Sequence, residues 1–358
     1  MTPDKGSQFA LGTFSTAGGT LFAGLVLGES AAPLEKLVPR TRFSRTGGNA
    51  PLSVLSLLEN WGENLALLRE IAVSLLGDNE KRGIKDEAFV PISTLKVHPP
   101  VNLPRQVFCA GANYKKHVID LIVDQAIGPN KDTSVEERRA QTAKMMDDRA
   151  AHGVPFVFSK PVSAITGAFD SVILPRQAQQ PDWELELAVI IGKPARHVSR
   201  EQALDYVAGY TIVNDVTNRD LVFRKDIGAM GADWLMAKGS PTYLPTGPFL
   251  VPAVFIDDPQ NLRITLKLNG QMMQDESTAD MIFGVARIIE FLSANVQLWP
   301  GDLIATGSPA GNGTHYNRYL TPGDLMEGSI TGLGTQRNRC VAEGAETDSA
   351  NRAISSGQ

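Results

Sequence analysis

Residues 182–192 read Asp-Trp-Glu-Leu-Glu-Leu-Ala-Val-Ile-Ile-Gly, and apolar and acidic side chains alternate in the first half. A period of two predicts a β-strand with Glu184 and Glu186 on one face. Residues two apart on a strand lie about 6.6 Å from each other, so two ionised carboxylates repel by about 2.5 kcal/mol at an effective dielectric near 20. The same face continues into Ala188 and Ile190, which predicts a hydrophobic interior. Two charges entering a core require a cation, which could be Arg, Lys or a metal ion.

The composition of the 358-residue chain is that of a folded protein. Its hydrophobic fraction of 42% supports a sizeable core, and its length suggests two domains or one large domain with appendages. The net charge of -5 is mild and gives no reason to expect nucleic acid or an anionic membrane as a partner. Cys109 and Cys340 lack the spacing of a metal site or a disulfide framework, so we expect a cytoplasmic protein.

The first 100 residues predict a small N-terminal domain with a linker. Residues 9–27 have the pattern of a β-hairpin. Residues 51–76 have apolar side chains at helical spacing, and Gly62 is expected to divide them into two helices. Three prolines fall within residues 92–104, which predicts an extended linker. The N-terminus lacks a signal-peptide pattern, and no apolar run reaches the roughly 18 residues that a membrane span needs.

Residues 101–342 predict the main domain. Ser134 and Glu137 have capping-box spacing, so a helix should begin there and run towards Arg149. Its apolar stripe is thin, which favours a mobile surface helix, or lid, within an insertion of about residues 115–153.

Strands dominate the rest of this domain. The Asn269-Gly270 pair predicts a hairpin, because both residues tolerate the backbone of a tight turn. Residues 199–207 predict a short helix, and residues 277–291 form the clearest helical pattern of the chain. The polar, small-residue-rich tail at 343–358 is expected to be disordered.

A third carboxylate, Asp215, ends another apolar strand. Adjacent strand ends could bring it beside Glu184 and Glu186. Three carboxylates with no His or Cys nearby are hard oxygen ligands, which suit Mg²⁺, Ca²⁺ or Mn²⁺ better than Zn²⁺. A strand whose acidic face is merely solvated is the alternative.

His117 and Asp120 are a candidate base and its orienting partner. On a helix, their spacing of three residues puts the carboxylate within reach of the imidazole. A carboxylate partner stabilises the imidazolium that a general base becomes. The alternative is a structural role, which is more common for a lone His near a helix start.

Lys238 and the loop at 306–313 are candidate anion-binding groups. Lys238 lies between an apolar approach and a turn, which is compatible with a cleft position where it holds a substrate anion. Thr306 and Gly307 begin a glycine-rich loop after a strand, and such loops expose N–H groups to an oxyanion or carboxylate. The loop lacks the ending of a P-loop, so a nucleotide or sugar-phosphate binder has little support.

Taken together, these stretches resemble the fumarylacetoacetate hydrolase family from about Val107 to Leu333. The matching stretches are residues 111–120, 160–165, 182–192, 209–220, 237–238, 269–270 and 300–311. The resemblance implies a β-rich α+β fold: a mixed β-roll around a large β-sheet core, with a small α+β N-terminal domain. It also implies a homodimer.

The resemblance also implies roles for individual residues. It implies a metal site holding Mg²⁺ or Mn²⁺, with Ca²⁺ an option in a crystal, and a water-activating dyad on a lid that orders when ligand binds. Lys238 and Thr306 match positions that hold the oxo-acid end of the substrate. The expected sets are Glu184, Glu186 and Asp215 for the metal; His117, Asp120 and Lys238 for catalysis; and Tyr114, Arg219, Thr306 and Gly307 for substrate.

The chain departs from the family pattern near the expected substrate. Val222 stands where the family commonly has Gln, and Gly239 stands where Ser is usual. His315 and Tyr316 add rings near the expected mouth of the site. With the long lid insertion, these departures favour a larger and less polar substrate.

The activity implied is that of a divalent-metal-dependent hydrolase acting on carbon–carbon bonds. Its substrate would be a 1,3-dicarbonyl, acylpyruvate-type 2-oxo acid, from the catabolism of aromatic or related compounds. The metal would stabilise the enolate form of the substrate while His117, oriented by Asp120, deprotonates water. The alternatives are a decarboxylase, an isomerase or tautomerase, and a 2-oxo-3-deoxy sugar acid dehydratase. A non-catalytic binding protein with the same fold is a further class.

Overall fold

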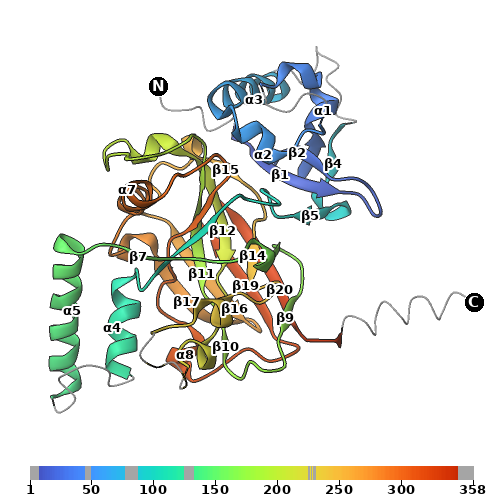
Figure 1. The fold of residues 1–358 in the computed structure, drawn as a ribbon. Coiled ribbons are helices and arrows are strands. Elements are labelled where there is room, and N and C mark those ends of the chain that lie inside the picture. Colours follow the sequence, from blue (N-terminus) through green and yellow to red (C-terminus); the bar gives the residue numbers. More distant parts are fainter. Residues whose placement is uncertain are drawn as a thin grey trace, which may run out of the picture.

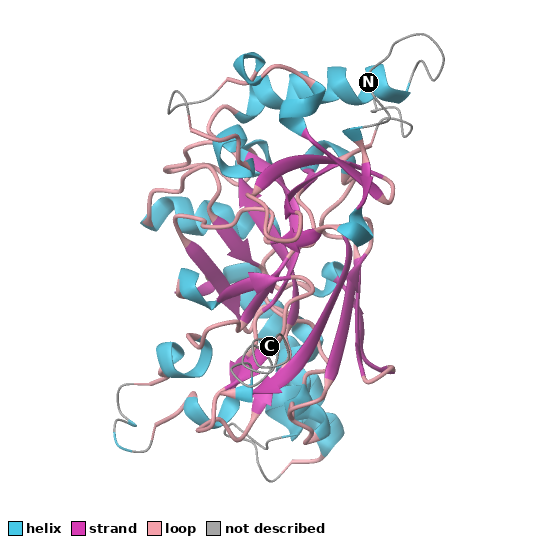
Figure 2. Ribbon diagram, turned by 90° about the vertical axis from the view of Figure 1, so that its right-hand side faces the viewer, coloured by secondary structure: helices cyan, strands magenta, loops and turns pink. Residues whose placement is uncertain are grey.

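The computed structural model describes residues 8–44, 50–76, 88–124, 133–224, 226, 228 and 231–345. Three sheets of five or more strands carry the fold, and the helices lie mainly around them (Figure 1). Figure 2, turned by 90°, shows long strands curving through the middle of the molecule, with helices towards both ends. The expected β-rich α+β architecture is confirmed.

The central sheet has eight strands and is organised around β11 (Leu185–Ile191). β11 runs antiparallel to both neighbours, β12 (Val207–Asn214) and β18 (Leu303–Ala305). All seven residues of β11 are buried, so the apolar run of this stretch covers both faces of a central strand. The outer strands are β6 (Val107–Gly111), β7 (Phe156–Ser159), β8 (Ile165–Gly167), β14 (Leu244–Thr246) and β15 (Val251–Pro252).

A second sheet of five strands packs against β11. It contains β16 (Arg263–Leu268) and β17 (Gln271–Ser277), and the turn between them has positive φ at Asn269 (53°) and Gly270 (83°). The hairpin predicted at this pair is therefore confirmed. Gly328 lies against the side chain of Leu185, so the two sheets meet closely at the start of β11. The other strands are β9 (Val172–Leu174), β19 (Leu325–Ile330) and β20 (Gly334–Ala342).

The N-terminal sheet lies at one end of the molecule (top of Figure 1). The predicted hairpin is confirmed as β1 (Ala10–Ser15) and β2 (Phe22–Leu27). Part of the predicted linker is instead β5 (Lys96–His98), which pairs with β1. Leu11 and Leu250 exchange backbone hydrogen bonds of 2.9 and 2.8 Å, which join this sheet to the rest of the fold. The sheet is completed by β3 (Ser30–Pro33) and β4 (Val90–Pro91).

Two helical regions were predicted in the N-terminal half, and both are helical in the structure. The helices α2 (Val54–Leu58) and α3 (Trp61–Leu76) exist, but Gly62 lies inside α3 and does not separate them. A single glycine lowers helix stability by only about 1 kcal/mol, which the buried face of α3 offsets. Ser134 caps α5 (Val135–His152) with the expected capping box, so that prediction is confirmed. The helix α1 (Leu34–Leu37) completes the N-terminal set.

The helix expected at 277–291 begins later than predicted. The side chain of Ser277 caps a short 3₁₀ turn, η10 (Thr278–Asp280), and Met281 then leaves the helical region. Gly284 precedes the real helix, α7 (Val285–Asn295). The helix expected at 199–207 is a 3₁₀ turn, η6 (Ala203–Tyr206). The other 3₁₀ turns are η2 (Arg40–Arg42), η4 (Ile92–Thr94), η5 (Val162–Ala164), η7 (Arg219–Leu221) and η9 (Ala253–Phe255).

The remaining short elements lie around the site described below. They are α4 (Lys115–Asp124), β10 (Pro181–Asp182), β13 (Thr217–Asn218), α6 (Trp234–Lys238) and α8 (Gly313–Tyr316). Residues 346–358 of the tail expected to be disordered lie outside the described residues, as do residues 125–132 of the expected lid. Within the part of the chain that the structure describes, no helix has the length and apolar character of a membrane span.

Candidate metal and substrate site

Three buried carboxylates meet at one end of the β11–β12 pair. Glu184 precedes β11, Glu186 is its second residue, and Asp215 follows β12. The strands are antiparallel with Leu185 opposite Asn214, so the beginning of one meets the end of the other. Each residue offers a carboxylate oxygen, and these oxygens all lie within 4.8 Å of one another. The structure thus brings together all three predicted metal ligands.

Two buried lysines bond to these carboxylates. Lys238, at the end of α6, donates from Nζ to Glu184 Oε2 and to Asp215 Oδ2, both at 2.6 Å. Lys160 donates to the other oxygen of Asp215, also at 2.6 Å, and to two backbone carbonyls. Burial lowers the pKa of Lys160, whereas for Lys238 the charges of Asp215 and Glu184 outweigh burial and raise the pKa. Lys160 was not a predicted site residue, although it lies in one of the family-like stretches.

Arg219 connects the cluster to a fourth buried carboxylate, Asp182. Its guanidinium donates to Asp182 at 2.8 Å and to Glu184 at 2.7 Å. Asp182 also accepts hydrogen bonds from the backbone of Gly313 at 2.6 Å and from Thr314. Arg219 therefore binds a predicted metal ligand in this conformation. Sequence reasoning missed Asp182, whose only signal was its place at the head of the opening stretch.

The charges of the cluster do not balance around Glu186. Among the described residues, its one hydrogen bond is from the backbone N–H of Gly307, at 2.7 Å, and no cation pairs with it. Burial, together with the negative charges of Asp215 and Glu184, raises the pKa of Glu186 well above its usual range. Glu184 is the opposite case: burial acts to raise its pKa, but Arg219 and Lys238 hold it well below the usual range. A hard divalent cation at the three carboxylates would supply the missing positive charge, so this donor set fits Mg²⁺ or Mn²⁺.

Tyr114 and the loop after β18 surround Glu186. Tyr114 is fully buried, and its hydroxyl has no hydrogen-bond partner within the described ranges. Burial and the nearby Glu186 raise its pKa well above the usual range, so the hydroxyl stays protonated and can donate. Thr306 donates its hydroxyl proton to the Leu187 carbonyl at 2.9 Å, and the Gly307 N–H is used by Glu186. The predicted contacts of these three residues with substrate remain predictions.

His117 lies on α4 and is half-buried as a residue. Burial lowers the pKa of this imidazole to about 4, and Arg219 adds to the effect against the opposing charge of Glu184. His117 is therefore neutral at pH 7 and can accept a proton. The charges of Glu184 and Arg219 both act on the pKa of His117, so its ring lies near the carboxylate cluster.

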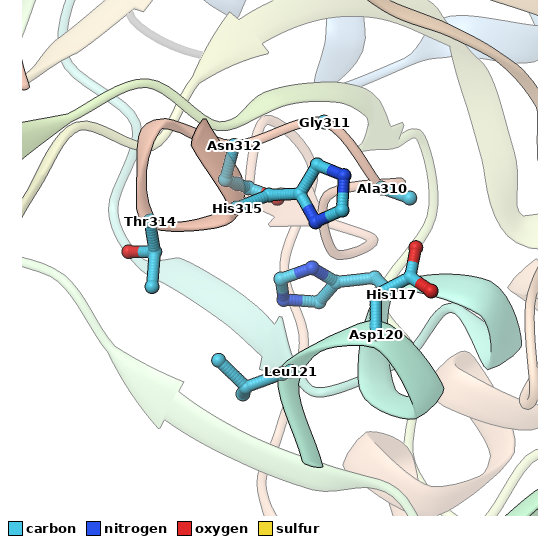
Figure 3. A pocket seen from close by; sticks show the side chains of 8 residues that line it. All are labelled: His117, Asp120, Leu121, Ala310, Gly311, Asn312, Thr314 and His315. Atoms are coloured by element: carbon cyan, nitrogen blue, oxygen red, sulfur yellow. The ribbon is translucent and has the colours of Figure 1, made fainter. Parts of the chain in front are cut away.

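Asp120 does not orient His117 in this structure. Its carboxylate accepts a hydrogen bond of 2.7 Å from Arg139 on α5, and none of the described hydrogen bonds joins it to His117. In the view of Figure 3, the Asp120 carboxylate points away from the His117 ring. A carboxylate binds the charged guanidinium of Arg more strongly than it binds a neutral imidazole. This difference explains why Asp120 pairs with Arg139. The expected dyad therefore remains a prediction.

A small cleft, open to solvent, lies between α4 and the loop that carries α8. His117 and Asp120 form one wall, and His315 stands on the other, near the His117 ring (Figure 3). The remaining lining residues are Leu121, Ala310, Gly311, Asn312 and Thr314.

Comparison with known proteins identifies the family that the chain matches. Residues 106–341 match the family described as fumarylacetoacetate (FAA) hydrolase, C-terminal. The chain is 32% identical over 293 residues to a mitochondrial oxaloacetate tautomerase of Bos taurus, covering 81% of this chain and 80% of that protein. It is 43% identical over 188 residues to a 2,4-didehydro-3-deoxy-L-rhamnonate hydrolase of Sphingomonas sp., covering 52% of this chain and 64% of that protein.

A similar solved structure is that of maleylpyruvate hydrolase from Sphingobium sp., in complex with manganese(II) and pyruvate. The TM-score is 0.66 at 26% identity, over 93% of this chain and 99% of that one. The mixed, β-rich fold of this chain is thus that of the enzymes it resembles.

Proposed function

Because the chain belongs to the fumarylacetoacetate hydrolase family, we propose that it hydrolyses a carbon–carbon bond in an acylpyruvate-type 2-oxo acid, with Mg²⁺ or Mn²⁺ as cofactor. The observation that carries this proposal is the buried cluster of Glu184, Glu186 and Asp215, in which Glu186 lacks a cationic partner among the described residues. The manganese in the similar maleylpyruvate hydrolase supports a divalent metal. A divalent cation bound there would polarise the oxo group of the substrate as a Lewis acid.

The side chains around the cluster then perform the proton transfers. Neutral His117 takes a proton from water, and the hydroxide oxygen adds to the acyl carbonyl carbon of the substrate. The bond between that carbon and the adjacent CH₂ breaks, and the CH₂ carbon takes the proton from the His117 imidazolium. The products are a carboxylic acid and pyruvate. The ammonium of Lys238 lies beside the cluster, where it stabilises negative charge that develops on the oxo-acid part.

Tautomerisation of a 2-oxo acid is the second candidate, and the pairing of Asp120 favours it. With Asp120 bonded to Arg139, His117 has no carboxylate partner within the described ranges to orient it for attack by water. A tautomerase needs only a base that takes the proton from the enol oxygen of the substrate while a proton is delivered to its α-carbon, or the reverse. The similarity to oxaloacetate tautomerases, which extends over 81% of the chain, supports the same candidate.

A substrate panel with two readouts separates the candidates. Purified protein with Mn²⁺ or Mg²⁺ would be given acylpyruvates of several acyl groups and, separately, the enol form of oxaloacetate. We expect pyruvate to be released from an acylpyruvate, and we expect a chelator to stop the reaction. Loss of enol absorbance without pyruvate release would contradict hydrolysis in favour of tautomerisation. No metal-dependent change in either readout would contradict both.

A further inference from the structure

We propose that Asp182 is a positioning residue for the substrate: it fixes the guanidinium of Arg219 in the orientation that binds the carboxylate of a 2-oxo acid. The inference rests on the proposed function, since it concerns the 2-oxo acid end that both candidate reactions share. Asp182 is neither a metal ligand nor a catalytic residue, and it acts through Arg219.

The pairing of β10 with β13 brings Asp182 and Arg219 together. Asp182 lies opposite Thr217 in this two-stranded sheet, and Arg219 follows directly after β13. The backbone N–H of Arg219 donates to the Gln180 carbonyl at 2.9 Å, which anchors the start of η7 beside β10. The two side chains therefore meet because of the backbone register of the strands.

The guanidinium of Arg219 is held from two sides. Its Nε donates to Asp182 Oδ2 at 2.8 Å, and its Nη2 donates to Glu184 Oε1 at 2.7 Å. The third nitrogen, Nη1, takes part in none of the described hydrogen bonds, and the side chain is 23% exposed. Because the guanidinium is planar, two fixed nitrogens also fix the direction of the third. A fixed guanidinium with a nitrogen still available suits a carboxylate ligand.

The Asp182 carboxylate is fully buried, and both of its oxygens accept hydrogen bonds. Oδ1 accepts from the backbone of Gly313 at 2.6 Å. Oδ2 accepts from Arg219 and from the backbone and hydroxyl of Thr314, at 3.2 and 3.0 Å. Asparagine has only one acceptor oxygen, and its NH₂ group would face an N–H donor. Asp182→Asn therefore cannot keep both Arg219 and the start of α8.

Other bonds hold the α8 loop independently of Asp182. The indole Nε1 of Trp183 donates to the Gly311 carbonyl at 2.9 Å, and the Asn312 amide donates to the Trp183 carbonyl at 3.0 Å. By contrast, Asp182 is the one partner of Arg219 Nε among the described hydrogen bonds. Loss of the Asp182 charge should therefore affect the orientation of Arg219 more than the position of the loop.

The first test compares Asp182→Asn with Asp324→Asn as a matched control. Asp324 is also a buried carboxylate that accepts from an arginine, Arg318, and from the backbone and hydroxyl of a threonine, Thr321. Both variants should lose a similar amount of stability towards urea. At saturating Mn²⁺, only Asp182→Asn should raise KM for the 2-oxo acid, by about 10- to 100-fold, as partners that orient a ligating group usually do. The change in kcat should be smaller.

A binding measurement separates positioning from a general loosening of the fold. Calorimetric titrations of the manganese-loaded wild type and both variants would use pyruvate and methyl pyruvate. In Asp182→Asn, the affinity for pyruvate should fall by about 10- to 100-fold and that for the ester by less than about 3-fold, since the ester lacks the charge that Arg219 binds. Equal losses for the two ligands, or the same loss in Asp324→Asn, would overturn the proposal.

A double variant tests whether Asp182 acts through Arg219. The KM of Asp182→Asn combined with Arg219→Gln should equal that of Arg219→Gln alone, because residues that act as a unit are not additive. Additive losses would contradict the proposal. If Asp182→Asn does not fold, Thr314→Val takes its place, because it keeps the carboxylate and removes one of its donors. It should raise KM about 3-fold, and an unchanged KM would overturn the proposal.

Turnover and binding fail separately. If the wild type turns over no member of the substrate panel, the proposed function falls, while the pyruvate titrations still decide the role of Asp182. If the wild type is active and Asp182→Asn keeps its KM and its affinity for pyruvate, the positioning role alone falls. If the wild type does not bind pyruvate, the positioning role falls and the substrate panel decides the function.

Discussion

Replacement of His117 with alanine is expected to lower kcat by about 10²- to 10⁴-fold, the usual contribution of a general base. Manganese affinity should stay within about 2-fold of the wild type, because His117 lies outside the carboxylate cluster. Steady-state kinetics on the best acylpyruvate and calorimetric titration with Mn²⁺ would measure the two quantities. Full activity in the variant would show that another group moves the proton.

The pH dependence of kcat/KM is a second test of the role of His117. His117 acts as a base only when it is unprotonated, and its pKa is lowered to about 4. The part of the kcat/KM profile that His117 controls should therefore stay level as pH falls from 7 to about 5 and should drop only near pH 4. A histidine with an ordinary pKa would lose activity around pH 6.5. An inflection near 6.5 that disappears in His117→Gln would contradict the lowered pKa.

Replacement of Glu186 with glutamine is expected to abolish metal binding without destabilising the metal-free protein. Loss of a partner that only orients a metal ligand reduces affinity by about 10- to 100-fold, so loss of a ligand should cost more than about 10²-fold. In the metal-free protein, the same change removes a charge that burial and its two neighbours disfavour. The free energy of unfolding should therefore be unchanged or higher, as measured by urea denaturation in the presence of a chelator.

The Asp215→Asn variant is the matched contrast to Glu186→Gln. Asp215 is also a proposed metal ligand, but unlike Glu186 it has cationic partners. Lys160 and Lys238 each donate to Asp215 at 2.6 Å. Removal of one partner from a buried ion pair lowers stability by about 3–5 kcal/mol, since the remaining charges stay buried. Both variants should thus lose the metal, and only Asp215→Asn should lose stability. Equal destabilisation of the two variants would show that Glu186 has a cationic partner in solution.

Local sequence patterns predicted the elements on which the site is built. The alternation at 182–192 predicted β11, because the side-chain period of a strand is set by the backbone alone. The same is true of the capping box at Ser134 and of the turn at Asn269-Gly270, whose signals lie within four residues. The meeting of Glu184, Glu186 and Asp215 could be expected because each lies at the end of an apolar strand.

The rest of the site depends on contacts between distant segments, which no local pattern encodes. Asp182 joins Arg219 and α8 because of how β10, η7 and the loop after β18 pack together. Asp120 binds Arg139 because α4 packs against α5, although its sequence spacing favoured His117. The late start of α7 has a local cause, but the spacing of apolar residues in the sequence does not reveal it. Ser277 caps a 3₁₀ turn, and α7 begins only after that turn.

The central claim is that the three carboxylates hold one divalent cation. Crystals grown with Mn²⁺ and measured near the manganese absorption edge would locate the ion by its anomalous scattering. The account predicts one strong anomalous peak per chain, within about 2.0–2.4 Å of oxygens from Glu184, Glu186 and Asp215, as expected for a hard cation on carboxylates. A peak elsewhere in the chain, with none at these three residues, would contradict it.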